Sequence, residues 1–272
     1  MSLQVLALVF GAVAVTALAL LRLFAAEVYD VVIVWMTARW YAAVFKKLSN
    51  GVRILDVGIG TATALVQNKA LLLEKRLSVV GFDYEASYIR KAEQVLEAAG
   101  LFRPVPEGTD GYKPGDFYCR VFQRSIYDAD LISLCEKDPT KKVASDYTVP
   151  EDSRFDVAYF SGSLTVMPDP PAALRAVEPL LKPDGRIFIT QTFEKKHSNF
   201  KAALKPLLKY ITTIDFGQLT TEADLKRIIA QADIYETISM EPITGSISTG
   251  LQTAYLIELR LKDEADRTAN QK

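Results

Sequence analysis

The sequence predicts an α/β protein with a parallel β-sheet covered by helices on both faces, and three observations predict it. Short apolar stretches typical of buried strands alternate with helical stretches along most of the chain. The first such strand, 52–57, runs into a turn that contains Gly58 and Gly60, with Asp56 expected beside the turn rather than inside the core, and the second strand, 77–83, ends in Asp83. Consecutive parallel strands need crossover connections, and helices that make these crossovers lie on the faces of the sheet.

The expected elements follow one another without an internal repeat or a low-complexity segment. After the glycine turn they are a helix from about Ala64, a strand over 77–83, a helix over 86–99, a strand over 118–123, a helix over 129–136, a strand over 155–160, a helix over 171–181, a strand over 187–192, a helix over 221–232, and strands around Ser239 and over 254–261. The connecting segments are loops over 103–116 and up to Arg154, and a turn over 182–185.

Composition excludes several classes of protein. The 272 residues carry 32 basic and 33 acidic side chains, so a net charge of −1 gives no signature of nucleic-acid binding. His197 is the only histidine, which excludes a histidine-rich metal site, and no metal is predicted. Cys119 and Cys135 lack metal-type spacing and form no disulfide framework, as is usual in a reducing compartment.

The N-terminal stretch Leu3–Leu21 is nearly all apolar and ends at Arg22. As a helix it would span roughly 28 Å, about one hydrocarbon core. A cleaved signal peptide is the alternative, but no basic residue precedes the run, and bulky Phe24 falls where cleavage needs a small residue. Basic residues follow the segment, so we expect a single-pass membrane protein with its body in the cytoplasm. The organelle is not predicted.

A second helical stretch, from Glu27 to Leu48, is apolar almost all round but contains Asp30 and Arg39, which argue against a second span. Its aromatic residues suit either a membrane interface or a helix packed on the globular domain, and both are compatible. The predicted domains are an anchor helix over 1–26, this apolar and aromatic helix over 27–50, a globular domain over 51–262, and a charged disordered tail over 263–272.

Ligands of such sheets bind beyond the carboxyl ends of the strands. Asp83, about twenty residues after the glycine turn, suits both hydroxyls of a ribose. A dinucleotide such as NAD is one possible ligand, and a dehydrogenase therefore an alternative function. However, the dinucleotide fingerprint needs a third glycine where this chain has Thr63.

Four motifs in order, 54–62, 81–83, 155–161 and 181–187, make the chain similar to class I S-adenosylmethionine-dependent methyltransferases over roughly 52–261. The resemblance implies a Rossmann-like, doubly wound, seven-stranded and mostly parallel sheet with a reversed last strand. It also implies S-adenosyl-L-methionine as the cofactor. Residues implied at the cofactor are Asp56, Gly58, Gly60 and Thr61 near its methionine part, Asp83 and Tyr84 near the ribose, Ser125 and Ile126 along the adenine edge, and Ser161 near the methyl group.

The chain departs from the family pattern at two positions. Ala62 replaces a usual third glycine, which a small side chain should tolerate, and Ser125 replaces a common acid. Aromatic faces attract a cationic sulfonium, so Tyr29, Trp40 and Tyr41 are candidates for a lid, with plain packing as the alternative. The catalytic residue is unknown; the candidates are Tyr41, Ser161 and His197. Asp169 is expected to cap a helix.

We therefore expect methyl transfer by in-line displacement to a small or lipophilic acceptor at a membrane surface. Alternatives are a catalytically inactive scaffold that binds the cofactor and holds a membrane partner, and a protein methyltransferase. The acceptor, the methylated atom and the oligomeric state are not predicted.

Overall fold

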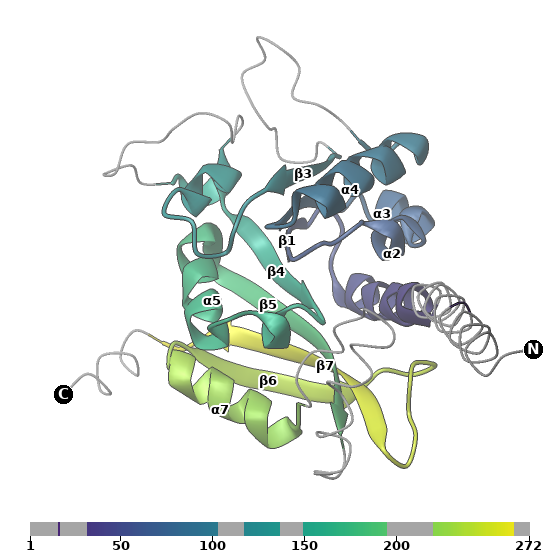
Figure 1. Ribbon diagram of the computed structural model, residues 1–272. Helices are drawn as coiled ribbons and strands as arrows, with labels where there is room; N and C mark the ends of the chain where they lie inside the picture. Colours follow the sequence, from purple (N-terminus) through teal and green to yellow (C-terminus); the bar gives the residue numbers. More distant parts are fainter. Residues whose placement is uncertain (1–15, 17–31, 103–116, 137–148, 195–219, 264–272) are drawn as a thin grey trace, which may run out of the picture.

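The computed structural model describes residues 16, 32–102, 117–136, 149–194 and 220–263, and they build one mixed sheet between two layers of helices (Figure 1). The strands run in the order β3-β2-β1-β4-β5-β7-β6. β1 to β5 pair in parallel, whereas β7 is antiparallel to both of its neighbours. The strands are β1 (Arg53–Val57), β2 (Ser78–Asp83), β3 (Cys119–Gln123), β4 (Phe155–Ser161), β5 (Leu181–Glu194), β6 (Tyr235–Pro242) and β7 (Gln252–Leu261). This arrangement confirms the α/β prediction and the reversed strand.

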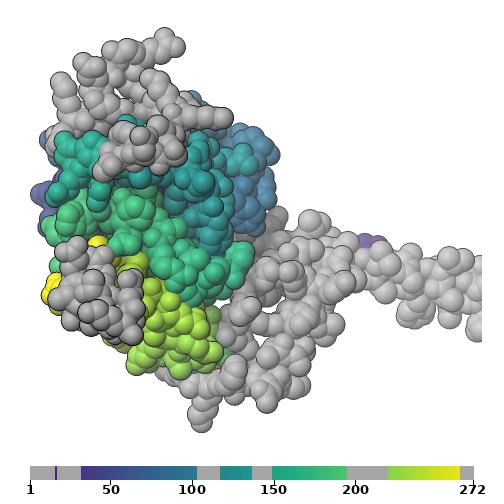
Figure 2. Space-filling model, turned by 90° about the vertical axis from the view of Figure 1, so that its left-hand side faces the viewer, coloured from purple at the N-terminus to yellow at the C-terminus, as the bar shows by residue number. Residues whose placement is uncertain are grey.

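Helices cover both faces of the sheet (Figure 1). A helix over residues 32–47, here called the N-terminal helix, lies on one face together with α2 (Thr63–Val66), α3 (Lys69–Glu74) and α4 (Ala86–Ala98). The opposite face carries α5 (Pro170–Val177) and α7 (Glu222–Ala232), which pack side by side, as Figure 2 shows from that side of the molecule.

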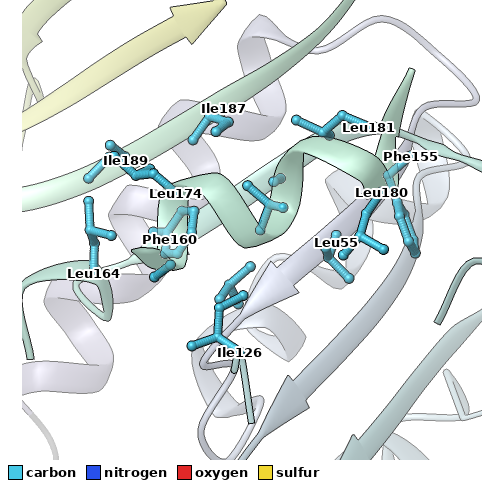
Figure 3. Close-up of a cluster of buried hydrophobic side chains, with 14 of the residues drawn as sticks. Leu55, Ile126, Phe155, Phe160, Leu164, Leu174, Leu180, Leu181, Ile187 and Ile189 are labelled. Atoms are coloured by element: carbon cyan, nitrogen blue, oxygen red, sulfur yellow. The ribbon is translucent and has the colours of Figure 1, made fainter. Parts of the chain in front are cut away.

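Two hydrophobic clusters fill the spaces between the sheet and these layers. The first joins α5 and α7 to the sheet, and its central side chains include Leu55, Phe160 and Leu174 (Figure 3). The second joins Phe45 of the N-terminal helix and Leu65 of α2 to the other face of the sheet. Both faces of the central strands are therefore buried, as in other parallel sheets, and their sequences are apolar at nearly every position.

Several predicted boundaries are wrong for identifiable reasons. The helix after the glycine turn is broken into α2 and α3 at Asn68, whose side-chain amide donates to the carbonyls of Ala64 (3.0 Å) and Ala38 (2.8 Å). The predicted helix 171–181 ends at Val177 because Pro179 cannot donate a helical hydrogen bond. In place of the helix 129–136 the structure has a 3-10 helix, Leu131–Cys135.

The predicted turn at 182–185 is a bulge inside β5. Leu181 pairs with Phe155, but the next pair joins Arg186 to Val157, so the residues between them loop out of the ladder. Gly185 lies tightly within this bulge, since a Cβ there would approach the carbonyl oxygen of Lys182 to 2.9 Å.

The predicted membrane anchor Leu3–Leu21 falls, apart from Thr16, outside the described residues, as do the loop 103–116 and most of the charged tail. In the part of the chain that the structure describes, no helix has the length and apolar character needed to cross a membrane.

Candidate active site

The glycine turn after β1 is held by backbone hydrogen bonds to β2. The N–H groups of Gly58 and Ile59 donate to the carbonyl oxygen of Phe82, at 2.9 and 3.1 Å. Gly58 and Gly60 have φ angles of +75° and +59°, which favour glycine. A Cβ on Gly58 would lie 2.7 Å from the Cβ of Ser163, whereas a Cβ on Gly60 would meet nothing within 4 Å. Gly58 is thus required by close packing inside the protein, and Gly60 leaves its backbone open to a ligand.

Asp83 is fixed beside this turn at the end of β2. Its Oδ2 accepts from the N–H of Gly60 at 3.1 Å, and its Oδ1 accepts from the N–H of Glu85 at 3.0 Å. Burial raises the pKa of Asp83, and these backbone hydrogen bonds partly oppose that rise. A carboxylate oriented in this way keeps lone pairs for a ligand with two neighbouring hydroxyl groups.

Asp56 is not beside the turn, as the sequence indicated, but inside the core. It lies on β1 opposite Gly81 of β2 and Tyr159 of β4, and its side chain is 0% exposed. The hydroxyl of Tyr41 donates to its Oδ2 at 2.6 Å, while its Oδ1 has no hydrogen-bond partner among the described residues. Burial raises the pKa of Asp56 to about 7, although the hydrogen bond from Tyr41 lowers it.

Tyr41 is brought to Asp56 by the N-terminal helix. Its ring makes edge-to-face contacts with Tyr159 (centroids 5.0 Å apart) and Phe45 (5.7 Å). Burial and the neighbouring Asp56 raise the pKa of its phenol, so Tyr41 stays protonated at neutral pH and acts as a donor. Tyr41 was predicted either to form a lid or simply to pack on the domain. The structure shows that it packs against Tyr159 and Phe45 and donates one hydrogen bond to Asp56.

Trp40, the second described lid candidate, lies on the same helix as Tyr41 and packs beside the end of β4. Its indole N–H donates to the hydroxyl of Ser246 at 3.0 Å, which ties the N-terminal helix to the β6–β7 connection. A Cβ on Gly162, which follows β4, would lie 3.1 Å from the indole ring. Trp40 is therefore buried and packed against backbone, and Tyr29 lies outside the described residues.

Ser161 ends β4 on the same side of the sheet as Asp56 and Tyr159. Its hydroxyl lies close enough to Tyr41 and Tyr159 to lower the pKa of both phenols, although it forms no hydrogen bond of standard geometry with any residue in the described ranges. Tyr159 is instead paired with the hydroxyl of Thr190 on β5 at 2.9 Å. Tyr159 and Thr190 were not predicted as site residues. One indication of them is present in the sequence, since each carries a hydroxyl group within a strand that is mostly apolar.

The residues predicted along the adenine edge belong to a local turn and to the core. The N–H of Ser125 donates to Asp128 (2.8 Å) and its hydroxyl accepts from the N–H of Tyr127 (3.2 Å), so both groups take part in a local turn. Ile126 is buried in the core beneath α5 (Figure 3). Asp169 caps α5 by accepting from the N–H of Ala172 at 3.0 Å, as predicted.

The remaining predicted site residues do not contribute to the cluster formed by Asp56, Tyr41, Tyr159 and Ser161. The Thr61 hydroxyl pairs with that of Thr63 at 2.9 Å, and Tyr84 is 75% exposed. His197 lies outside the described residues. Within the described ranges no group of three or more His, Cys, Asp or Glu side chains is arranged to hold a metal ion.

Replacing Gly58 by alanine is expected to lower the free energy of unfolding by about 2–4 kcal/mol, because a left-handed backbone and a close contact with Ser163 both oppose the new methyl group. Gly60→Ala is the matched control, since it has the same backbone conformation but open space, and about 1 kcal/mol is expected there. Urea denaturation measures both variants. Equal losses would show that the contact with Ser163 is unimportant.

The sequence of this chain was compared with models of known protein families and with curated proteins. A family model described as "Methyltransferase domain" matches residues 34–235, which include most of the N-terminal helix, the glycine turn and Asp83. No match was found among curated proteins.

Solved structures share the fold at low sequence identity. The [4+2]-cyclase SpnF is 15% identical with a TM-score of 0.54, and the match covers 82% of this chain and 81% of that one. A putative sarcosine dimethylglycine methyltransferase from Galdieria sulphuraria is 14% identical (TM-score 0.53; 84% and 86% covered). The mitomycin 7-O-methyltransferase MmcR is 13% identical (TM-score 0.53; 84% of this chain covered), and this chain spans about half, 54%, of its length.

Proposed function

We propose that this chain, which belongs to the methyltransferase domain family and is an S-adenosylmethionine-dependent methyltransferase, transfers a methyl group to a small or lipophilic acceptor at a membrane surface. The observation that carries the cofactor assignment is the link between the glycine turn and the end of β2. Gly60 has open space above it and donates its N–H to Asp83, so a ligand bound there meets both the backbone and the carboxylate.

The described residues fit S-adenosylmethionine at this edge of the sheet. Asp83 would accept from the ribose hydroxyls, and the turn from Gly58 to Thr61 would receive the methionine part. Asp56 Oδ1 and the Ser161 hydroxyl are buried polar atoms without a hydrogen-bond partner among the described residues, and a polar ligand would satisfy them.

When bound, the cofactor would supply a methyl group on a sulfonium: the acceptor atom would bond to the methyl carbon in line with the breaking C–S bond, and the neutral thioether S-adenosylhomocysteine would leave. The protein's part is to hold the two reactants in line and to exclude water. Trp40 and Tyr41 of the N-terminal helix are buried near the end of β4 and would shield that side of the site from water, and Ser161 lies next to the Tyr41 phenol. Because burial keeps Tyr41 protonated, it suits a donor that orients a partner rather than a general base.

Support for a lipophilic acceptor comes from the N-terminal part of the chain. The apolar stretch Leu3–Leu21 precedes the helix that carries Trp40 and Tyr41, and the first turns of that helix expose Val32 and Trp35, each 44% exposed. If the stretch is an anchor, the helix that closes the site begins next to the membrane, and an acceptor dissolved in the bilayer has the shortest path to it.

Two other functions remain as alternatives. A scaffold that binds the cofactor without turnover would use the same turn and Asp83, and a protein methyltransferase would differ in its acceptor alone. The cyclase SpnF shares this fold and is named for a different reaction, which makes turnover, and not fold, the deciding measurement.

The test is methyl transfer from labelled S-adenosylmethionine to membrane extracts and, separately, to aqueous metabolite and protein fractions. We expect label in an organic-soluble product from the membrane extract. Label confined to protein would favour the protein methyltransferase. Binding of S-adenosylmethionine without labelling of any fraction would favour the scaffold, and binding of NAD(H) instead would contradict the assignment.

The membrane prediction is tested by extraction. We expect the full-length chain to stay with membranes in alkaline carbonate, and a chain that starts near Val28 to be released, because the apolar stretch is then missing. Release of both forms would show that Leu3–Leu21 is not an anchor.

A further inference from the structure

Asp56 is a fully buried carboxyl group with no positive charge against it in the described residues. The titratable groups around it are Tyr41 from the N-terminal helix, Asp83 from β2, Cys119 from β3 and Tyr159 from β4. None of these is a cation, and none of the ion pairs in the described ranges includes Asp56. An ionised carboxylate here is uncompensated, which is costly in a buried place.

The two oxygens of Asp56 have different surroundings. Oδ2 is held by the Tyr41 hydroxyl at 2.6 Å, whereas Oδ1 is buried and has no partner in the described part of the chain. Tyr41 is itself fixed by edge-to-face packing on Phe45 and Tyr159. The phenol therefore holds the carboxyl in one orientation and leaves Oδ1 as the atom with capacity for a ligand.

We propose that Asp56 holds a proton in the ligand-free protein and releases it when the ammonium group of the cofactor's methionine part binds, with Tyr41 as the positioning residue that tunes this exchange. The inference rests on the proposed function. The proton passes to solvent, and a neutral carboxyl group becomes a carboxylate paired with an ammonium ion. The Tyr41 hydroxyl remains the donor to Oδ2 in both states.

The pH range of the effect follows from the pKa of Asp56, which burial raises to about 7. At pH 6 most ligand-free molecules hold the proton, so binding is expected to release about 0.9 proton per site, and about 0.5 at pH 7. The dissociation constant for S-adenosylmethionine should fall about eightfold between pH 5.5 and 6.5, and level off above pH 7.

The experiment is titration calorimetry of the full chain between pH 5.5 and 7.5, in buffers that differ in ionisation enthalpy. Up to about pH 6.5 the ligand keeps its charge, because an ordinary α-amino group has a pKa of about 7.7–8.0. At pH 7.5 part of the free ligand is uncharged and takes up a proton on binding, so the net release there is corrected by a titration of the ligand alone. S-adenosylmethionine is expected to release protons at pH 6, and adenosine, which lacks the methionine part, to bind without release. The same enthalpy for S-adenosylmethionine in every buffer at pH 6 would overturn the inference while leaving the proposed function intact. No binding at any pH would overturn both.

Variants separate the positioning role of Tyr41 from a purely structural one. Because its hydrogen bond lowers the pKa of Asp56, Tyr41→Phe should move the midpoint of proton release to higher pH, so that release persists at pH 7.5. Tyr159→Phe removes an equally buried phenol that is bonded to Thr190 and not to Asp56, and should leave the midpoint unchanged. Equal shifts in both variants, or no shift in Tyr41→Phe, would overturn the role of Tyr41.

Discussion

Asp83→Ala is expected to weaken the binding of S-adenosylmethionine by about 100-fold or more while the sheet stays folded. The carboxylate is oriented by the N–H groups of Gly60 and Glu85, and each oxygen keeps a lone pair for a ligand bound beside Gly60. Hydrogen bonds to a charged group contribute about 1.5–3 kcal/mol each, so losing two to a ribose gives a change of this size. Calorimetry with S-adenosylmethionine and with adenosine measures it, and both ligands should be affected alike.

A control is needed because Asp83 also holds the turn. Asp128→Ala is matched to it: this exposed carboxylate also accepts from a backbone N–H, that of Ser125, after the neighbouring strand β3. If Ser125 only forms a turn, the affinity of the Asp128→Ala variant for the cofactor should stay within about threefold of the affinity of the unmodified protein. A threefold change corresponds to less than about 1 kcal/mol of binding free energy. An Asp83→Ala protein that unfolds at the usual temperature and binds both ligands normally would contradict the ribose assignment.

The strands were predictable because their signal is local. β3 and β4 lie within a residue of the predicted strands, since an apolar run bounded by polar residues is visible in the sequence alone. The bulge in β5 was not predictable. Its residues 182–185 have the composition of a turn, and only the pairing with β4 shows that the chain re-enters the same strand after them.

The candidate site was predictable only where backbone conformation decides it. Gly58, Gly60 and Asp83 stand together because a strand end, a turn and the next strand end are close in any parallel sheet. Asp56 was misplaced because its cover comes from side chains outside its own strand, Tyr41 of the preceding helix and Tyr159 of β4, a hundred residues further along the chain. All five residues of β1 are buried, so no alternation marks the acid as interior. The resemblance identified the acid, and the structure supplied its partner.

Asp56→Asn is expected to stabilise the ligand-free protein at pH 8 by about 4 kcal/mol and to have little effect near pH 4. The folded carboxyl has a pKa of about 7, against an ordinary value of 3.8, so the folded state holds more protons than the unfolded chain between these values. The stability of the unmodified protein must therefore fall as the pH rises from about 4 to 7. An amide does not ionise, and its oxygen can still accept from Tyr41.

Urea denaturation of the ligand-free protein at pH 5 and pH 8 measures this difference. Asp156→Asn is the control of opposite sign, because Asp156 is paired with Lys182 at 2.6 Å; removing its charge should destabilise by up to about 1 kcal/mol. A loss of stability in Asp56→Asn at pH 8 would mean that the carboxylate is compensated in the folded protein. A gain would show that this position is kept acidic at a cost in stability, as expected where charge is needed for binding.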